Sequence, residues 1–405
     1  MIRETTLLSN VVLQTFDVSG PFVLGMSKLG YSKLGKATDT GSWTEWTAHA
    51  TSIVAHRGAR RDGVTIQNEV GLLTVTMRDP GNILNVANGL FPDTPARLVL
   101  RLGGVDRPLF TGRIYDMRRD LVRLTGRHTL TPVAVITIAD AVRSHNSITR
   151  YGALPTAGYE TFRARILRLT ETAREPIEAP STSPTALLAR TVYESSLSNH
   201  LTLACQTMGA MWYVGADGTT RTRILDPAKA PQGPPFTFGT RPGALHHIRS
   251  QPSNGLADFV NTLYARQHRA KPDPNNPSSW VADDSTELTY YDPVSQGRWG
   301  NREAVHDTNY YFRTGDDFSA CQARITPARD PKARVRRITW NAQERLADIP
   351  RLELGNVISY TDLSVTRTGP DGGTYWPEQR AFIIGIHHTI TPTRWLIDLD
   401  LFGTD

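Results

Sequence analysis

Residues 96–140 constrain the fold of this chain more than any other stretch. They contain short runs rich in β-branched and apolar residues, and glycine or proline separates one run from the next. A Gly103-Gly104 pair stands between the first two runs, and Gly112 lies inside the second. Such runs are typical of antiparallel strands, and a glycine within a strand marks a bend or a bulge. The stretch therefore predicts a small antiparallel barrel or sandwich.

The length of 405 residues allows roughly two to three domains with hydrophobic cores of their own. No apolar run approaches the length that crosses a bilayer, and the first residues lack the layout of a signal peptide. We therefore expect no membrane span and synthesis in the cytoplasm of the producing cell. Cys205 and Cys321 lie far apart and in no metal-binding pattern, which predicts buried free thiols.

The net charge of +6 permits contact with nucleic acid or with an acidic surface. However, the basic residues occur in short clusters, and no aromatic stacking motif lies among them. We interpret these clusters as solvated faces and loops, and we expect no sequence-specific contact with nucleic acid.

An irregular loop is predicted over residues 24–35, where Ser-Lys-Leu-Gly occurs twice and glycine recurs every fifth residue. Its apolar side chains are the candidate assembly residues: Leu24, Met26, Leu29, Tyr31 and Leu34. Two interpretations stay open. The loop is either an assembly element that becomes ordered against a neighbouring protein or a disordered excursion without a role.

Helical patterns occur in the middle of the chain. The spacing of apolar residues predicts helices within 159–171, from Ser183-Pro184 onward, and over 198–208. A β-hairpin with an Asp217-Gly218 turn follows the last of them. This order of elements predicts an α+β domain.

Strands return near the end of the chain, over residues 334–340, 352–360, 381–388 and 394–402. Gly385 lies within a Phe-Ile-Ile-Gly-Ile run that parallels the Phe-Thr-Gly-Arg-Ile run around Gly112. We expect both glycines to be structural bends. The parallel suggests a duplicated domain, although the inward and outward phases of the two runs do not register cleanly.

These patterns together predict a mainly β chain with an α+β part. We expect two antiparallel β-barrel domains, over 1–145 and 236–405, with a smaller α+β domain over 146–235 between them. An insertion around 269–332 interrupts the second barrel.

Four short motifs follow one another through the first part of the chain: Arg57-Gly58, residues 71–79, Phe91-Pro92 and residues 109–114. In this order and spacing they resemble the first tube domain of phage tail-hub proteins. That family includes the baseplate hubs of contractile tails and the N-terminal part of siphophage tail-associated proteins. The helices and hairpin of the middle region are similar to the family's second, α+β domain.

The resemblance implies a virion structural protein, a minor tail protein that forms the hub at the tail tip. It implies a homotrimer whose six tube-like barrels continue the six-fold tail tube and serve DNA ejection and host attachment. The implied partners are the tail tube or distal tail protein above and a tail-tip or central fibre protein below. The tape measure protein is a further candidate, and genome DNA would pass through the lumen without sequence-specific binding.

The chemistry-bearing residues form no pattern of a catalytic, cofactor or metal site. His246-His247 and His387-His388 lie on predicted strands, where consecutive side chains point to opposite faces, so neither pair can chelate a metal. No phosphate-binding loop, dinucleotide fingerprint or nucleophile motif occurs. We therefore expect a protein that is not an enzyme and holds no cofactor or metal.

Two other functions stay open. A glycan-binding module would use exposed tryptophans as stacking groups, with the candidates Trp43, Trp46, Trp280, Trp299 and Trp376. A cell-wall hydrolase would need two carboxylates at a defined separation, with the candidates Asp283-Asp284, Asp316-Asp317 and Asp398 with Asp400.

Overall fold

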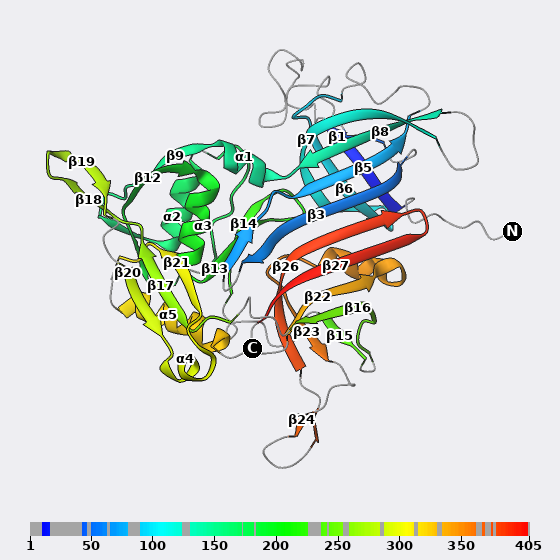
Figure 1. Cartoon of the computed structure of the whole chain (residues 1–405). Coiled ribbons are helices and arrows are strands. Elements are labelled where there is room, and N and C mark those ends of the chain that lie inside the picture. The colour runs from blue at the N-terminus through cyan, green and yellow to red at the C-terminus, as the bar shows by residue number, and fades with distance from the viewer. Residues whose placement is uncertain are drawn as a thin grey trace.

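The fold is described here from a computed structural model of the chain. The described residues are 10–16, 43–46, 50–62, 65–79, 90–123, 130–171, 173–181, 184–225, 236–240, 243–253, 259–283, 287–311, 315–329, 334–361, 367–368, 374–375 and 378–403. The chain is mainly β with an α+β part, as its sequence predicts (Figure 1).

One 14-stranded sheet runs through the molecule in the order β16-β22-β27-β26-β3-β5-β8-β7-β6-β1-β2, with β4, β15 and β23 off this path. Its first half is built from β1 (Val11–Phe16), β2 (Trp43–Glu45), β3 (Ala50–Asp62), β4 (Thr65–Asn68), β5 (Leu72–Arg78), β6 (Pro95–Leu102), β7 (Val105–Arg123) and β8 (Leu130–Ala139). Its second half is built from β15 (Phe236–Gly239), β16 (His247–Ser253), β22 (Arg334–Asn341), β23 (Val357–Thr361), β26 (Glu378–Thr391) and β27 (Arg394–Gly403).

The two halves repeat the same strand order. The first reads β3-β5-β8-β7-β6-β1, and the second reads β16-β22-β27-β26-β23-β15. Both also carry bulges at matching places. The β7–β8 register shifts between Ile114 and Asp116, and the β26–β27 register shifts between Ile383 and Gly385. A bulge after the first residue of β3 likewise matches one after the first residue of β16. The halves differ at one end, because β1 runs antiparallel to β6 whereas β15 runs parallel to β23.

A single hydrophobic core fills the inner side of both halves. Along β8 and β27 every second residue is buried, as in Ile136 and Ile138 or Leu399 and Leu401, because successive side chains of a strand point to opposite faces. The 3₁₀ helix η6 (Ala342–Arg351) adds Ile349 to this core. The strand expected over 352–360 begins only at Val357, because a turn and irregular backbone follow η6 over 352–356.

The α+β part lies beside the sheet and has its own core (Figure 1). It consists of α1 (Ala141–Ser147), β9 (Thr149–Ala153), β10 (Tyr159–Thr161), α2 (Phe162–Thr170), β11 (Leu187–Ala189), β12 (Thr191–Ser196), α3 (Leu197–Thr207), β13 (Ala210–Val214) and β14 (Thr220–Ile224). The predicted helices at α2 and α3 and the hairpin β13–β14 are confirmed.

The helix predicted to start at Ser183-Pro184 is wrong. Leu187 and Leu188 form β11, which pairs with β10, and Val192 belongs to β12, which pairs with β9. Strand partners far away in sequence outweigh the local helical spacing here, since periodicity cannot separate a short buried strand from a helix.

A further group of elements leaves the sheet after β16 and returns at β22. It comprises β17 (Thr262–Gln267), β18 (Ala270–Asp273), β19 (Asn276–Ala282), β20 (Glu287–Tyr291), α4 (Pro293–Trp299), β21 (Glu303–Thr308) and α5 (Gly315–Ala328). Strands β20, β17 and β21 form a three-stranded sheet that packs with α5 around Leu263, Ala265 and Cys321. The short β24 (Arg367–Thr368) and β25 (Thr374–Tyr375) form a separate hairpin. The domain limits 1–145, 146–235 and 236–405 stay a prediction.

Candidate functional site at the seam between the two halves

The two halves join where residues 53–58 of β3 pair antiparallel with residues 385–390 of β26. We call this pairing the seam. Gly58 faces Gly385 across it, with a φ of 115° that side chains other than glycine rarely adopt. A Cβ atom on Gly58 would lie 2.3 Å from the carbonyl oxygen of Ile384. The close approach of the two strands therefore requires glycine at this position.

A polar network crosses the outer face of the sheet at the seam. The rings of His56 and His387 stack with their centroids 4.2 Å apart. His387 Nε2 lies 2.6 Å from Asp400 Oδ2, and Arg337 Nε donates to Asp400 Oδ1 over 2.6 Å. Four neighbouring strands, β22, β27, β26 and β3, are thus tied together by side chains as well as by their backbones.

Burial and neighbouring charge set the protonation of this network. Burial, followed by the charge of His387, lowers the pKa of His56 to about 4, so the ring is neutral at pH 7. Burial alone would raise the pKa of Asp400, but the hydrogen bonds from His387 and Arg337 hold it below its usual value. The carboxylate is therefore ionised and satisfied by two partners. Such a network stabilises one arrangement of strands, and it leaves no activated nucleophile.

Beneath the seam, Arg57 connects the sheet to the α+β part. This buried guanidinium donates to Glu353 Oε1 over 2.6 Å and to the carbonyl oxygen of Val214 at the end of β13 over 3.4 Å. Arg57-Gly58 is one of the motifs that carry the family resemblance. The structure gives both residues a place at the junction of the sheet halves with the α+β part.

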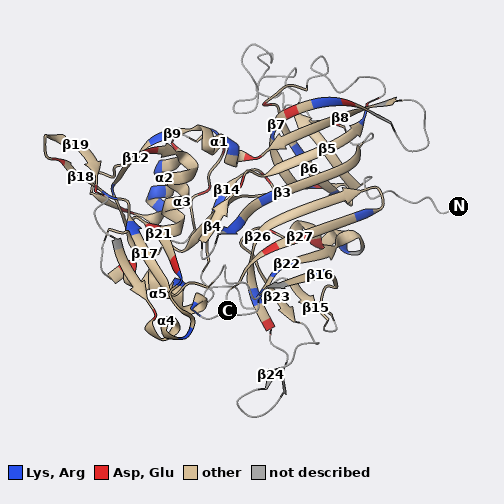
Figure 2. Cartoon of the chain, viewed as in Figure 1, with Lys and Arg blue, Asp and Glu red and all other residues tan. Residues whose placement is uncertain are grey.

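The outer face of the sheet continues across the seam as a polar surface of mixed charge. Thr74, Thr137 and Asp116 lie side by side in register on β5, β8 and β7. Figure 2 shows that most of the sheet ribbon is uncharged and that basic and acidic segments alternate on β7. Arg118 and Asp120 approach within 3.5 Å of each other there. The inner side of the sheet is filled by the core, so this face is the sheet surface that can meet a neighbour or a channel.

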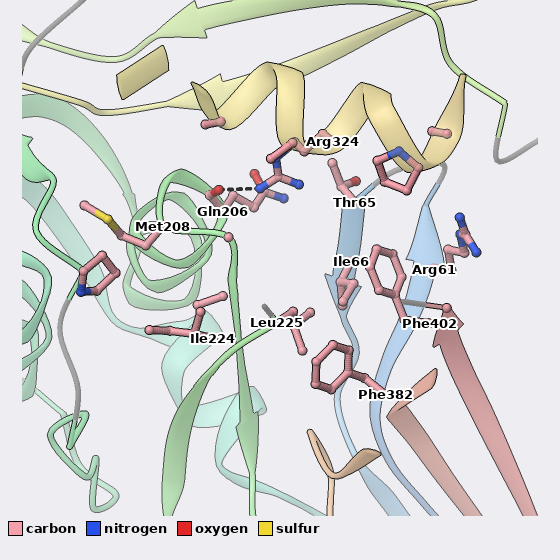
Figure 3. Close-up of a pocket in the computed structure, with 18 of the residues that line it drawn as sticks. Arg61, Thr65, Ile66, Gln206, Met208, Ile224, Leu225, Arg324, Phe382 and Phe402 are labelled. Atoms are coloured by element: carbon pink, nitrogen blue, oxygen red, sulfur yellow. Dashed lines mark hydrogen bonds between the residues drawn. The ribbon is translucent and has the colours of Figure 1, made fainter. Parts of the chain in front are cut away.

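A pocket of about 410 Å³ lies between three regions: the sheet at strands β3, β4, β26 and β27, the α+β part, and α5 (Figure 3). Apolar side chains from all three regions line it, among them Ile66, Met208 and Phe402 (Figure 3). Arg61 lies over the ring of Phe402, 5.0 Å from its centroid, and Arg324 donates to the carbonyl oxygen of Gln206 over 2.5 Å. None of the described residues that line the pocket is acidic or a histidine, so we assign it no chemistry.

The two candidate glycines occupy different positions. Gly112 lies where β7 passes the end of β8, and a Cβ atom there would lie 2.2 Å from the carbonyl oxygen of Ala139. Gly385 lies at the bulge of β26, with the nearest atom, Asp400 Oδ2, 3.0 Å from a Cβ atom. The bulges align Gly385 with Asp116 and not with Gly112. The structural role of each glycine stays a prediction.

The assembly candidates Leu24, Met26, Leu29, Tyr31 and Leu34 lie outside the described residues. The predicted opposite orientation of paired histidines holds on β26, where His387 joins the outer network and His388 is buried and accepts a hydrogen bond from Trp395. The two cysteines, Cys205 and Cys321, are buried free thiols, as predicted.

Four of the six acidic residues proposed for a hydrolase, namely Asp283, Asp317, Asp398 and Asp400, have structural partners. Asp317 is buried and accepts a hydrogen bond from Gln267, and burial raises its pKa to about 6. Asp398 accepts a hydrogen bond from Thr339 over 2.5 Å, and Asp283 lies 3.6 Å from Lys271. Asp284 lies outside the described residues.

The tryptophans proposed for glycan binding are spread over separate regions. Trp43 lies on β2 beneath the guanidinium of Arg97, and Trp280 lies on β19 beneath that of Arg190. Trp46 donates to Thr15, Trp299 lies in α4, and Trp376 lies outside the described residues. The four described tryptophans lie on or beside β2, on β19 and in α4, so they do not form one surface on which a glycan could stack.

The described ranges contain no group of three or more histidine, cysteine or acidic residues placed to hold a metal ion. None of their helices is long and apolar enough to cross a membrane.

Sequence reasoning missed His56, Arg337 and Asp400 as one unit. They belong to strands that are far apart in the chain. The signal in the sequence is that each of these residues falls at a solvent-facing position in the alternation of side chains along its strand.

No protein-family model and no curated protein sequence matches the chain. Solved structures do match over nearly its whole length. A tail protein from Neisseria meningitidis MC58 superposes with a TM-score of 0.59 at 11% identity, covering 98% of this chain and 97% of that one. The 43 kDa tail protein of prophage MuSo2 from Shewanella oneidensis gives 0.56 at 10% identity, covering 97% and 98%.

Prophage tail protein gp18 from Listeria monocytogenes EGD-e gives a TM-score of 0.51 at 10% identity, covering 90% of this chain and 92% of that one. All three agree with this chain over at least 90% of its length, which confirms the resemblance seen in the short motifs at the level of the fold. This chain has the fold of phage tail proteins.

Proposed function

We propose that the chain is a structural protein of a phage tail and forms the hub at the distal end of the tail tube. The observation that carries this proposal is the repeated half-sheet, because two equivalent halves joined in one chain let three copies present six equivalent units. A ring of this kind fits a six-fold tube on one side and a three-fold tip on the other. The partners would be a tube or distal tail protein above and a tip or fibre protein below.

The outer sheet face supports a channel-lining role. It is the sheet surface that the core leaves uncovered, and it carries threonines and mutually paired charges such as Arg337 with Asp400. DNA affinity grows with the number of phosphates that basic side chains neutralise. A wall of balanced charge would therefore let genome DNA pass without holding it. The loop over residues 24–35 stays our candidate for an assembly contact.

Copy number and symmetry test the proposal directly. We expect particles that contain this chain to hold three copies per tail, which image reconstruction would show as one ring directly beneath the tube. Quantitative mass spectrometry against the tube protein gives an independent count. A count of one or six copies, or a location away from the tube end, would contradict the hub assignment.

A further inference from the structure

Several strand edges of the sheet have no ladder partner among the described strands, and two of these edges lie on β16 and β7. Strand β16 pairs with β22 on one side only, and it stands at the end of the sheet order. Beyond Ile114, β7 pairs with β8 on one side, while its other edge runs on past the end of β6. Edges of this kind present a row of backbone donors and acceptors that another strand can join.

The repeat of the two halves identifies what these edges match. By strand order and bulge position, β16 is the counterpart of β3, and β7 is the counterpart of β26. Inside the chain, β3 and β26 pair with each other at the seam. Their counterparts lie apart within one chain, because β22, β27, β26, β3, β5 and β8 separate them in the sheet.

We infer that β7 of one copy of this chain pairs antiparallel with β16 of a second copy, in the register of the seam. Transferring the Ile53–Ile390 pair of the seam to the counterpart strands places Leu121 opposite Ser250, and Asp120 opposite Gln251. This inference rests on the proposed hub function and names the surface through which the copies meet. Pro252 lacks an amide hydrogen, which keeps the intermolecular ladder short on that side.

Burial at the seam shows which side chains the contact would cover. Leu121 is 66% exposed, whereas its counterpart Ile390 is fully buried. Tyr115 is 50% exposed, whereas its counterpart Ile384 is 1% exposed. The edge of β7 thus carries apolar side chains in the positions that the seam covers with a neighbouring strand, as expected where a second copy binds.

The geometry of the contact also sets its symmetry. Each chain offers one β7 edge and one β16 edge, so the contact is head-to-tail and builds a ring or an open filament. In a ring, seams inside chains would alternate with contacts between chains, and all of them would share one register. Closure with three copies gives the six-unit ring of the proposed function.

A cysteine pair tests the register. We expect the full chain carrying Leu121→Cys and Ser250→Cys to form covalent trimers with a short thiol cross-linker, in assembled tails and in the purified chain. A matched control carries Leu121→Cys and Val294→Cys, because Val294 is 81% exposed in α4 and far from both edges in the fold. The control should give no covalent trimer, and Cys205 and Cys321 are buried in both chains.

A charge on the edge tests the contact without cross-linking. Leu121→Lys should reduce trimer formation at least tenfold while the thermal midpoint of the single chain stays the same. Val294→Lys should change neither quantity. Three copies per ring without cross-linking of the 121/250 pair, and with an intact Leu121→Lys ring, would overturn this inference and leave the hub function standing. Absence of any three-copy ring from tails would instead overturn the hub function itself.

Discussion

The two halves of the large sheet share a framework, although their side chains differ almost everywhere. The bulge positions and the alternation of buried residues agree between the halves. For example, Ile138 and Leu401 are buried at equivalent positions next to the bulge. The edges differ: β3 is covered by β26 at the seam, whereas its counterpart β16 has no second ladder partner among the described strands. The comparison teaches that bulges and period-two burial define this fold, while the surroundings of each half define what its surfaces do.

The largest expected effect concerns the glycines that look equivalent in the sequence. Gly112→Val should lower the free energy of unfolding by about 3–5 kcal/mol, because its Cβ atom meets the backbone carbonyl of Ala139. Gly385→Val should cost about 1–2 kcal/mol, since the Asp400 side chain that it meets can move. Denaturant unfolding of both variants measures the difference. Equal losses would mean that the two positions are equivalent after all.

The next effect separates the covered edge from the open one. Ile390→Ala should cost about 2–5 kcal/mol in the isolated chain, because Ile390 is fully buried at the seam. Leu121→Ala at the counterpart position should stay within about 0.5 kcal/mol, since the side chain is 66% exposed. Thermal and denaturant unfolding check both values. A large loss for Leu121→Ala in a verified monomer would show that this edge is already covered within one chain.

The smallest effect is a pair of opposite pH dependences, one in each half. Burial, with the charges of Arg57 and His387, lowers the pKa of His388 to about 3, so the unfolded chain takes up this proton first. His388 therefore destabilises the fold as the pH falls from about 6.5. At the end of β8, burial raises the pKa of Asp140 to about 7, although backbone hydrogen bonds from Val142 and Gly71 oppose this. Asp140 therefore stabilises the fold as the pH falls through about 7.

Two variants isolate these contributions. Between pH 7.5 and pH 5, His388→Gln should gain unfolding free energy relative to the parent chain, and Asp140→Asn should lose it. Each change should be on the order of 2 kcal/mol. The asparagine keeps the side-chain oxygen that caps α1 by accepting from Val142. If the unfolding free energies of both variants, relative to the parent chain, changed in the same direction with pH, the opposite roles of His388 and Asp140 would be contradicted.

Much of the fold could be predicted from local patterns. The Asp217-Gly218 hairpin, the helix at α3 and most strands follow from turn residues and periodicity. The two similar runs around Gly112 and Gly385 indicated the duplication. However, the bulges align Gly385 with Asp116, so the two glycines are not at equivalent positions. The extra residues of the two bulges are Tyr115 and Ile384. Neither is a glycine, so the glycine signal for a bulge did not mark them.

The candidate site could not be predicted in the same way. Its members lie on strands that meet only through long-range pairing, as His56 does with His387. Sequence reasoning placed His387 on a strand and assigned it no partner. The stacked rings and the carboxylate of Asp400 depend on the order of strands in the sheet, which local propensity does not contain.

The elements between β16 and β22 leave and re-enter the sheet at adjacent points, since Ser253 pairs with Arg334. In the first half the counterpart strands β3 and β5 are linked by the short β4 excursion. An excursion whose two ends already touch adds little strain to the sheet, whatever its length. The sheet itself therefore tolerates an excursion of any content at this position, but Tyr310 of the present excursion joins the core of the α+β part. An engineer who grafts a new module there has to replace that contact as well.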